Sequence, residues 1–214
     1  MKRINTLIFD VSGVLIDDLY AVWLADKDAL SFYGYNYLPI EEFKQKFKLP
    51  IAEYYRSIGI PKEAIEKVDR KWYEFYSHYQ HLVRVFPEVK DVLSQLKTKG
   101  LRLGISSNTP NKFLKKHLHR FKMLLYFDAI VGREDCDEEK PSPKPILVAL
   151  SKLNANPKTS AYVGDMEEDM IAGKKAGVYT IAVDRKEAYQ PIWKLKLHNP
   201  DYIITNLNDL LNII

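Results

Sequence analysis

Residues 4–17 have the sequence INTLIFDVSGVLID, an apolar, β-rich run that stops at the carboxylate of Asp10 and the turn residue Gly13. An apolar run of about four to eight residues bounded by a turn signal is typical of a buried strand in a parallel sheet. Open α/β sheets bind ligands at the carboxyl ends of such strands, so the pattern predicts that Asp10 faces a crevice. Gly13 suits the tight backbone that follows, because glycine tolerates a positive φ. An equally simple interpretation is that Asp10 caps a turn, and the later sequence decides between the two.

The composition limits the classes of protein to which the chain can belong. A chain of 214 residues is long enough for one large or two small domains with a sizeable core. The formal net charge of +4, from 32 basic and 28 acidic side chains spread along the chain, favours a small anionic ligand and gives no nucleic-acid-binding stripe. The single cysteine, Cys136, excludes an internal disulfide and fits a reducing compartment. Without a leader pattern or an apolar run of about 18 residues, we expect a cytoplasmic protein with no membrane partner, either a monomer or a homodimer.

The predicted pattern of secondary structure changes along the chain. Residues 18–83 have apolar positions at helical spacing, and proline recurs there at intervals of eleven, which predicts four helices and no strand. From Pro87 onward helices and strands alternate, which predicts βαβ units around a parallel sheet covered on both faces. We therefore expect a doubly wound, Rossmann-like α/β core with an inserted all-helical cap domain. The predicted boundaries are 1–17 and 85–214 for the core and 18–84 for the cap.

The elements expected in the second part can be assigned from apolar periodicity and from glycine and proline punctuation. The predicted strands lie at 101–106, 127–131, 160–164, 179–183 and 202–204. The predicted helices lie at 87–99, 108–120, 144–153, 166–176 and 207–213.

Polar side chains follow several of these strands. Ser107 and Asn108 offer a hydroxyl and backbone amides at a helix start, where they can hold a phosphate oxygen or simply cap the helix. Lys140 opens the segment KPSP, in which two prolines restrict its direction. Asp165 and Asp169 stand four residues apart at a helix start and share one face. Two carboxylates on one face repel each other unless a cation or a lysine lies between them.

A hard divalent ion would satisfy Asp10, Asp165 and Asp169 together. Mg²⁺ characteristically takes one or two carboxylates, waters and a substrate phosphate. The set then comprises a nucleophilic carboxylate, a metal, a hydroxyl and a lysine around one anionic group. That combination predicts phosphoryl transfer through a covalent aspartyl intermediate.

The chain resembles the haloacid dehalogenase (HAD) superfamily, in the phosphatase branch whose helical (C1-type) cap is inserted directly after the first motif. Four stretches match in order and with the family's spacing over essentially the whole chain. They are FDVSGVL from Phe9, ISSN from Ile105, KPSP from Lys140 and VGDMEED from Val163. One such motif is weak, whereas four in order identify the chain as a member of the superfamily.

The resemblance implies a role for each matched residue. Asp10 would be the nucleophile that becomes phosphorylated, Ser107 with Asn108 would bind the phosphoryl group, and Lys140 would neutralise the charge of Asp10 and the phosphate. The substrate would be a small phosphate ester, with phosphoglycolate and sugar phosphates as the family's examples.

The resemblance also implies an Mg²⁺ site. Asp10 and Asp165 would be ligands, Asp169 would support the shell of the metal, and the backbone carbonyl of residue 12 would complete the protein's contribution. This last ligand does not depend on the side chain, so Ser12 can supply it.

Position 12 departs from the family pattern, because HAD phosphatases usually carry there a second aspartate that protonates the leaving oxygen. Ser12 is no comparable acid or base, and loss of general acid–base catalysis costs about 10²–10⁴-fold. Three interpretations stay open. The chain is a slow or specialised phosphatase in which Ser12 positions water and the substrate or another side chain supplies the proton, and this is the interpretation that we expect. Alternatively, it is a phosphometabolite-binding protein with little turnover, or a catalyst of another HAD reaction, of dehalogenase or phosphonatase type. The paired acids disfavour the dehalogenase, which uses no metal, and an engineered Asp→Ser exchange would also produce this sequence.

The cap is expected to set substrate specificity. The resemblance places the relevant segment near residues 47–53, and Lys48, Tyr54 and Arg56 are candidates to face the substrate, although each of them can equally be helix surface or part of the cap's core. We expect the cap to close over the site, with hinges at 16–18 and 84–87, because closure excludes water from the phosphoryl group.

Overall fold

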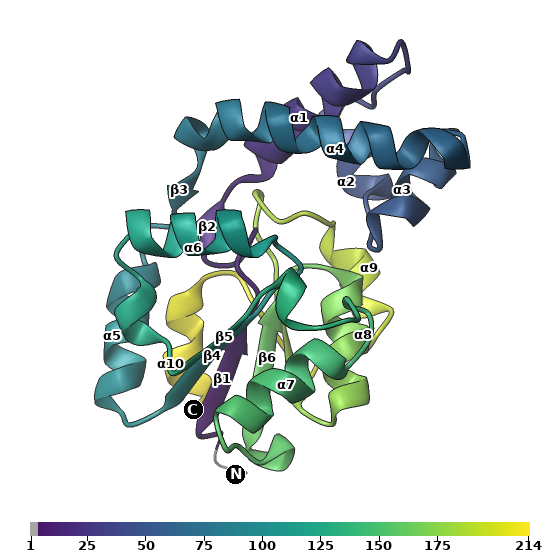
Figure 1. The fold of residues 1–214 in the computed structure, drawn as a ribbon. Helices are drawn as coiled ribbons and strands as arrows, with labels where there is room; N and C mark the ends of the chain where they lie inside the picture. The colour runs from purple at the N-terminus through teal and green to yellow at the C-terminus, as the bar shows by residue number, and fades with distance from the viewer. Residues whose placement is uncertain (1–3) are drawn as a thin grey trace.

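The computed structural model describes residues 4–214, and its centre is a parallel six-stranded sheet (Figure 1). The strand order is β5-β4-β1-β6-β7-β8, so the chain first builds the sheet on one side of β1 and then on the other. The Rossmann-like α/β core predicted from the sequence is confirmed, and each predicted strand is found. The strand predicted at 127–131 begins later than expected, at Ala129. The bounds are β1 (Thr6–Phe9), β4 (Arg102–Ser106), β5 (Ala129–Val131), β6 (Ser160–Gly164), β7 (Tyr179–Val183) and β8 (Tyr202–Ile204).

Helices cover both faces of this sheet. Ile8 and Tyr162 point to the face packed by α7 and α8, whereas Leu7 and Val163 point to the face packed by α5 and α10. All four residues of β1 are buried, as expected for a central parallel strand with helices on both sides. The helices of this part are α5 (Val89–Thr98), α6 (Asn111–Arg120), α7 (Lys144–Lys152), α8 (Glu167–Ala176), α9 (Ile192–Lys196) and α10 (Leu210–Ile213), with short 3₁₀ turns η2 (Leu124–Tyr126), η3 (Arg133–Asp135), η4 (Pro157–Thr159) and η5 (Leu207–Asp209).

Residues 19–82 form a separate layer of helices, here called the helical layer, above the carboxyl ends of the strands (Figure 1). It contains the four predicted helices and no strand. The three regularly spaced prolines occupy the N-cap positions of α2, α3 and α4, where a fixed φ and a missing N–H cost nothing. The bounds are α1 (Leu19–Phe32), α2 (Ile40–Lys46), α3 (Ile51–Ser57), α4 (Lys62–Tyr79) and the 3₁₀ turn η1 (Gln80–Leu82).

Two features were not predicted. Strands β2 (Ile16–Asp17) and β3 (Arg84–Val85) pair antiparallel, so the chain enters and leaves the helical layer through one narrow ribbon. Strands of two residues are too short to show an alternating pattern. The five-residue helix α9 was missed for the same reason. Within residues 4–214, none of the helices has the length and apolar character needed to cross a membrane.

Candidate active site

The site lies where the order of the sheet reverses. β1 is hydrogen-bonded to β4 on one side and to β6 on the other. Asp10, Ser107 and Asp165 directly follow the carboxyl ends of these three strands. The point at which an open α/β sheet changes direction leaves a crevice outside the strand ends. The sheet therefore brings together three of the residues that the sequence placed in the site.

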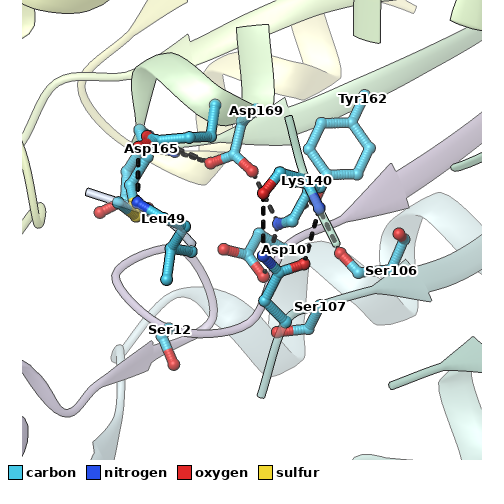
Figure 2. A network of polar contacts seen from close by, with 12 residues as sticks. Asp10, Ser12, Leu49, Ser106, Ser107, Lys140, Tyr162, Asp165 and Asp169 are labelled. Carbon is cyan, nitrogen blue, oxygen red and sulfur yellow. Dashed lines mark hydrogen bonds and ion pairs between the residues drawn. The ribbon is translucent and has the colours of Figure 1, made fainter. Parts of the chain in front are cut away.

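Lys140 is the centre of the charged cluster (Figure 2). Its Nζ lies 3.2 Å from Oδ1 of Asp10 and donates a 2.7 Å hydrogen bond to Oδ1 of Asp169. Burial alone would lower the pKa of this ammonium, but the carboxylates of Asp10 and Asp169 outweigh it and raise the pKa of Lys140. The lysine is therefore a fixed positive charge between the two acids.

The backbone and the ammonium of Lys140 are both held in place. Asn108 donates from Nδ2 to the carbonyl of Lys140 at 3.2 Å and accepts from its N–H at 3.1 Å. Lys140 Nζ also donates to the hydroxyl of Tyr162 at 2.7 Å, and that hydroxyl donates to the carbonyl of Ser106 at 2.7 Å. The side-chain amide of Asn108 is thus used to position Lys140, and the backbone N–H of Asn108 is the group that we still expect to bind the phosphoryl group. Tyr162 had no signal in the sequence, because a tyrosine in a buried strand resembles any other core residue.

Three buried carboxylates face each other at this point. One oxygen each of Asp10, Asp165 and Asp169 lies within 4.8 Å of the others. Within the described residues, Oδ1 of Asp165 has no hydrogen-bond partner, and Oδ1 of Asp10 has only the ion pair with Lys140. Burial and the neighbouring acids Asp169 and Asp10 raise the pKa of Asp165 well above its usual range. An all-oxygen cluster with an unpartnered oxygen and one lysine fits a hard divalent cation.

The local sequence explains how the acids are held. Oδ2 of Asp169 accepts hydrogen bonds from the N–H groups of Asp165 at 3.1 Å and Met166 at 3.0 Å, and so closes the first turn of α8. Oδ2 of Asp165 accepts from the N–H of Tyr189 at 2.6 Å. Gly13 has a φ of +73°, and a Cβ there would lie 2.1 Å from Oδ2 of Asp165. Only glycine therefore allows the first loop to approach the acids this closely.

Ser12 contacts a residue outside the predicted set. Its hydroxyl donates to Oδ2 of Asp18 at 2.8 Å, and the hydroxyl of Tyr189 donates to Oδ1 of Asp18 at 2.9 Å. Burial raises the pKa of Asp18 to about 7, although the bonds from Ser12 and Tyr189 oppose the shift. Asp17 and Asp18 directly precede α1 in the sequence, where an aspartate commonly occupies the N-cap position. Asp18 does occupy that position, but its side chain makes no capping hydrogen bond.

A cavity of about 120 Å³ lies between the strand ends and the helical layer. Asp10, Ser12 and Ser107 line its lower end. Side chains of α1, α2, α3 and α4 line most of the rest, together with core residues that include Arg133, Glu139, Met166 and Tyr189. The lining contains none of the cap residues expected to face the substrate, Lys48, Tyr54 and Arg56. Lys48 Nζ lies 4.0 Å from Oε2 of Glu53, with 38% of its side chain exposed, and Arg56 is exposed as well.

The helix α3 explains why Arg56 lies outside. Tyr54 and Tyr55 of this helix are fully buried. Because neighbouring positions of a helix point in different directions, the next residue, Arg56, is left on the outer surface. Arg56 therefore does not line the cavity in this structure, and its contact with the substrate stays a prediction.

Comparison with known proteins agrees with this geometry. The pattern of the family described as "Haloacid dehalogenase-like hydrolase" matches residues 7–183. The curated protein "Pyrophosphatase PpaX" from Bacillus mycoides is 28% identical over 216 residues, which cover 99% of this chain and 97% of that protein.

Solved structures show the same fold. A haloacid dehalogenase-like family hydrolase from Streptococcus pneumoniae superposes with a TM-score of 0.86 at 20% identity, covering 100% of this chain and 99% of that one. A structure described as a predicted phosphoglycolate phosphatase from Haemophilus somnus gives a TM-score of 0.84 at 22% identity, again covering 100% and 99%. The inserted helices are thus part of the architecture that these proteins share with this chain.

Proposed function

The chain belongs to the haloacid dehalogenase-like hydrolase family, and we propose that it is an Mg²⁺-dependent phosphatase that hydrolyses a small phosphate monoester through a phospho-aspartate at Asp10. The observation that carries the proposal is the buried cluster in which Lys140 holds Asp10 beside Asp165 and Asp169. A carboxylate that is buried, paired and open to a cavity suits a nucleophile. The name of the Bacillus mycoides relative supports chemistry at phosphorus.

The first step is attack by Asp10. A carboxylate oxygen of Asp10 forms a bond to phosphorus, and the bond between phosphorus and the ester oxygen breaks. The leaving oxygen departs with the electron pair of that bond and takes a proton from solvent or from the substrate. The hydroxyl of Ser107, which lies at the end of β4 and lines the cavity beside Asp10, hydrogen-bonds a phosphoryl oxygen. The fixed charge of Lys140 offsets the negative charge that accumulates between carboxylate and phosphate.

The second step is hydrolysis of the phospho-aspartate. Water attacks phosphorus, the bond between phosphorus and the Asp10 oxygen breaks, and inorganic phosphate and the free carboxylate form. Lys140 remains paired with Asp169 throughout, so the site does not lose its buried positive charge when Asp10 is esterified.

The metal site is built from the same acids. Asp10, Asp165 and the backbone carbonyl of Ser12 would hold Mg²⁺, and Asp169 would support its shell. Bound there, the ion would neutralise the charge of the nucleophile and of the substrate phosphate.

Ser12 limits the rate for poor leaving groups. Its hydroxyl is bound to Asp18, and a serine supplies no proton comparable to that of a carboxylic acid. We therefore expect slow turnover of alkyl phosphates and faster turnover of esters whose leaving groups need no proton. The same observation favours a second candidate, a protein that binds a phosphate ester and rarely turns it over.

The helical layer serves as the cap. We propose domain boundaries of 1–17 and 85–214 for the core and 18–84 for the cap, since β2 and β3 cross between them as one ribbon. Residues 1–3 of the core range lie outside the described residues. The proposed enzyme acts in the cytoplasm, as a monomer or a homodimer, which agrees with its single free cysteine.

The deciding experiment is phosphate release from p-nitrophenyl phosphate with Mg²⁺ and with a chelator. The variant Asp10→Asn keeps the shape of the nucleophile and removes its charge, so we expect its turnover to be abolished. Asp91→Asn, an exposed acid of α5, is the matched control. Turnover that survives Asp10→Asn would overturn the phospho-aspartate. A native chain that binds phosphate esters without releasing phosphate would establish the second candidate instead.

A further inference from the structure

The cavity above Asp10 has two unlike ends. Asp10, Ser12, Ser107 and Asn108 form the polar lower end. The upper walls are apolar and aromatic, and they come mainly from the helical layer. Their side chains include Val22, Phe43, Phe47, Ile51, Trp72 and Tyr76. Once a phosphoryl group occupies the lower end, these walls surround the leaving group.

The size of the cavity limits the leaving group. The volume is about 120 Å³, whereas an apolar protein cavity of about 150 Å³ holds one benzene molecule. Because the same cavity must also hold the phosphoryl group, a single ring is the upper limit for the apolar body of the leaving group. Flat aromatic walls favour such a ring through stacked or edge-on contacts.

The polar groups among these walls are mostly acids. Asp26 of α1 and Asp69 of α4 both line the cavity. Asp26 is 3% exposed and accepts a 2.9 Å hydrogen bond on Oδ2 from the hydroxyl of Tyr54. Beside it, the hydroxyl of Tyr55 is fully buried and makes no regular hydrogen bond within residues 4–214, although it lies close enough to the carboxyl of Asp26 to oppose the rise of its pKa. A buried carboxyl and an idle hydroxyl are costly unless a ligand pairs with them.

The one basic residue among the described lining of this cavity is already neutralised. Arg133 donates from Nε to Oε1 of Glu139 at 2.8 Å and from Nη1 to the hydroxyl of Tyr73 at 2.8 Å. Lys48 and Arg56, which would have favoured an anionic leaving group, lie outside the lining. The titratable side chains around the leaving group are therefore those of Asp18, Asp26, Asp69, Glu139 and Arg133, with acids in excess. A bound ammonium group would favour the ionised form of the buried carboxyl beside it. Such a pocket repels a second anionic group and attracts a cation.

We propose that the substrate is a phosphate monoester whose leaving group combines an apolar body of about one ring with an amino group, held by the carboxyl of Asp26 and the hydroxyl of Tyr55, with Asp69 adding to the negative field. This inference rests on the proposed function and specifies its substrate class. It separates the chain, by charge, from catalysts of pyrophosphate or phosphoglycolate hydrolysis, whose substrates carry a second anionic group.

The test uses three aryl phosphates of one shape and different charge. They are 4-(aminomethyl)phenyl phosphate, 4-methylphenyl phosphate and 4-(carboxymethyl)phenyl phosphate, with pyrophosphate and phosphoglycolate as further competitors. Phosphate release gives kcat/KM, and calorimetric titration of the native chain gives Kd for each ester. We expect the amine to exceed the methyl compound by at least about tenfold, because a hydrogen bond to a charged group is worth that much. The carboxylate should be the poorest of the three.

Two variants assign the preference to residues. Asp26→Asn should reduce the advantage of the amine over the methyl compound to near unity, whatever its effect on the turnover of the methyl compound itself. Tyr55→Phe should lower the amine's advantage while the helix α3 remains intact, as circular dichroism can verify. Asp28→Asn, on the same helix as Asp26 but outside the lining, is the matched control and should behave like the native chain.

The possible outcomes test the substrate class, the phosphatase activity and the role of Asp26 separately. Equal values for the three esters, or a preference for the carboxylate, would overturn the substrate class and leave the phosphatase intact. If no ester releases phosphate, the proposed function fails, and the order of the Kd values still decides whether the pocket selects an amine. An amine preference that survives Asp26→Asn would overturn the assignment to this carboxyl.

Discussion

The hydroxyl of Ser12 is hydrogen-bonded to the buried carboxyl of Asp18 at 2.8 Å. The side chain at position 12 is therefore tied to the start of the helical layer, and Figure 2 shows its oxygen directed away from the carboxylate of Asp10. Position 12 therefore carries no acid that could protonate the leaving oxygen. The proposed phosphatase should consequently depend strongly on the acidity of the leaving alcohol.

Ser12→Asp should restore the missing acid. We expect turnover of alkyl phosphates to rise by about 10²-fold or more, which is the lower range for general acid catalysis. The gain for p-nitrophenyl phosphate should be small, because nitrophenolate leaves without a proton. Initial rates across a series of leaving groups measure both effects.

Ser12→Ala is the control for this exchange. It removes the bond to Asp18 without adding an acid, so its dependence on the leaving group should match that of the native chain. If Ser12→Asp gives no gain on alkyl phosphates, position 12 does not limit the rate and the explanation offered for slow turnover is wrong.

Lys140→Gln should lower both the stability of the folded protein and its activity. Lys140 is 1% exposed and is the cation between Asp10 and Asp169. Removing one partner of a buried ion pair leaves uncompensated charge and costs about 3–5 kcal/mol. Urea denaturation measures this loss as a lower midpoint at an unchanged slope.

Lys144→Gln, at the start of α7, is the matched control. Lys144 pairs with Asp137 at 2.6 Å on the surface, and exposed pairs contribute little. Its midpoint should therefore stay at the native value. Equal effects of the two exchanges would show that the buried cluster contributes nothing special to stability.

Mg²⁺ should raise the melting temperature of the native chain. Binding to the folded state alone stabilises it by about 2.7 kcal/mol when the free ion is at 100 times its Kd. Asp165→Asn removes one carboxylate of the triad and should abolish most of the shift, whereas Asp137→Asn, an exposed acid nearby, should retain it. A full shift in Asp165→Asn would place the ion elsewhere.

The sequence predicted the core of the site because its residues follow strands. Asp10, Ser107 and Asp165 each end an apolar run, and parallel strands deliver their ends to one edge. Features that depend on tertiary contacts gave no such signal. Asp18 had the appearance of a helix cap, although its carboxyl turns to Ser12 and Tyr189.

The helical layer shows the same limit. Its four helices were predictable from apolar spacing and proline, but which side chains line the cavity depends on how the helices rotate against the core. Lys48 and Arg56 were chosen for their charge, whereas packing turned the aromatic residues of α3 inward. Charge alone does not tell whether a helical residue faces a ligand or water.

Asp26→Asn should make the protein more stable at neutral pH. Burial raises the pKa of Asp26 from 3.8 to about 7 in the folded chain, while hydrogen bonds from tyrosine oppose the shift. Between these two values the unfolded chain has released its proton and the folded chain has kept it. Stability therefore falls as pH rises from about 4 to 7, by at most about 4 kcal/mol for this group. Asparagine cannot ionise and still accepts the bond from Tyr54.

Urea denaturation at pH 5 and at pH 8 measures this effect. The gain of Asp26→Asn over the native chain should be larger at pH 8 than at pH 5, and Asp91→Asn should show no such difference. An equal gain at both values would mean that the carboxyl ionises as freely in the folded chain as in the unfolded one. Asp26 lowers stability at neutral pH, and packing alone would favour a neutral amide at its position. Because its carboxyl lines the cavity, we attribute its presence to the ligand that it binds.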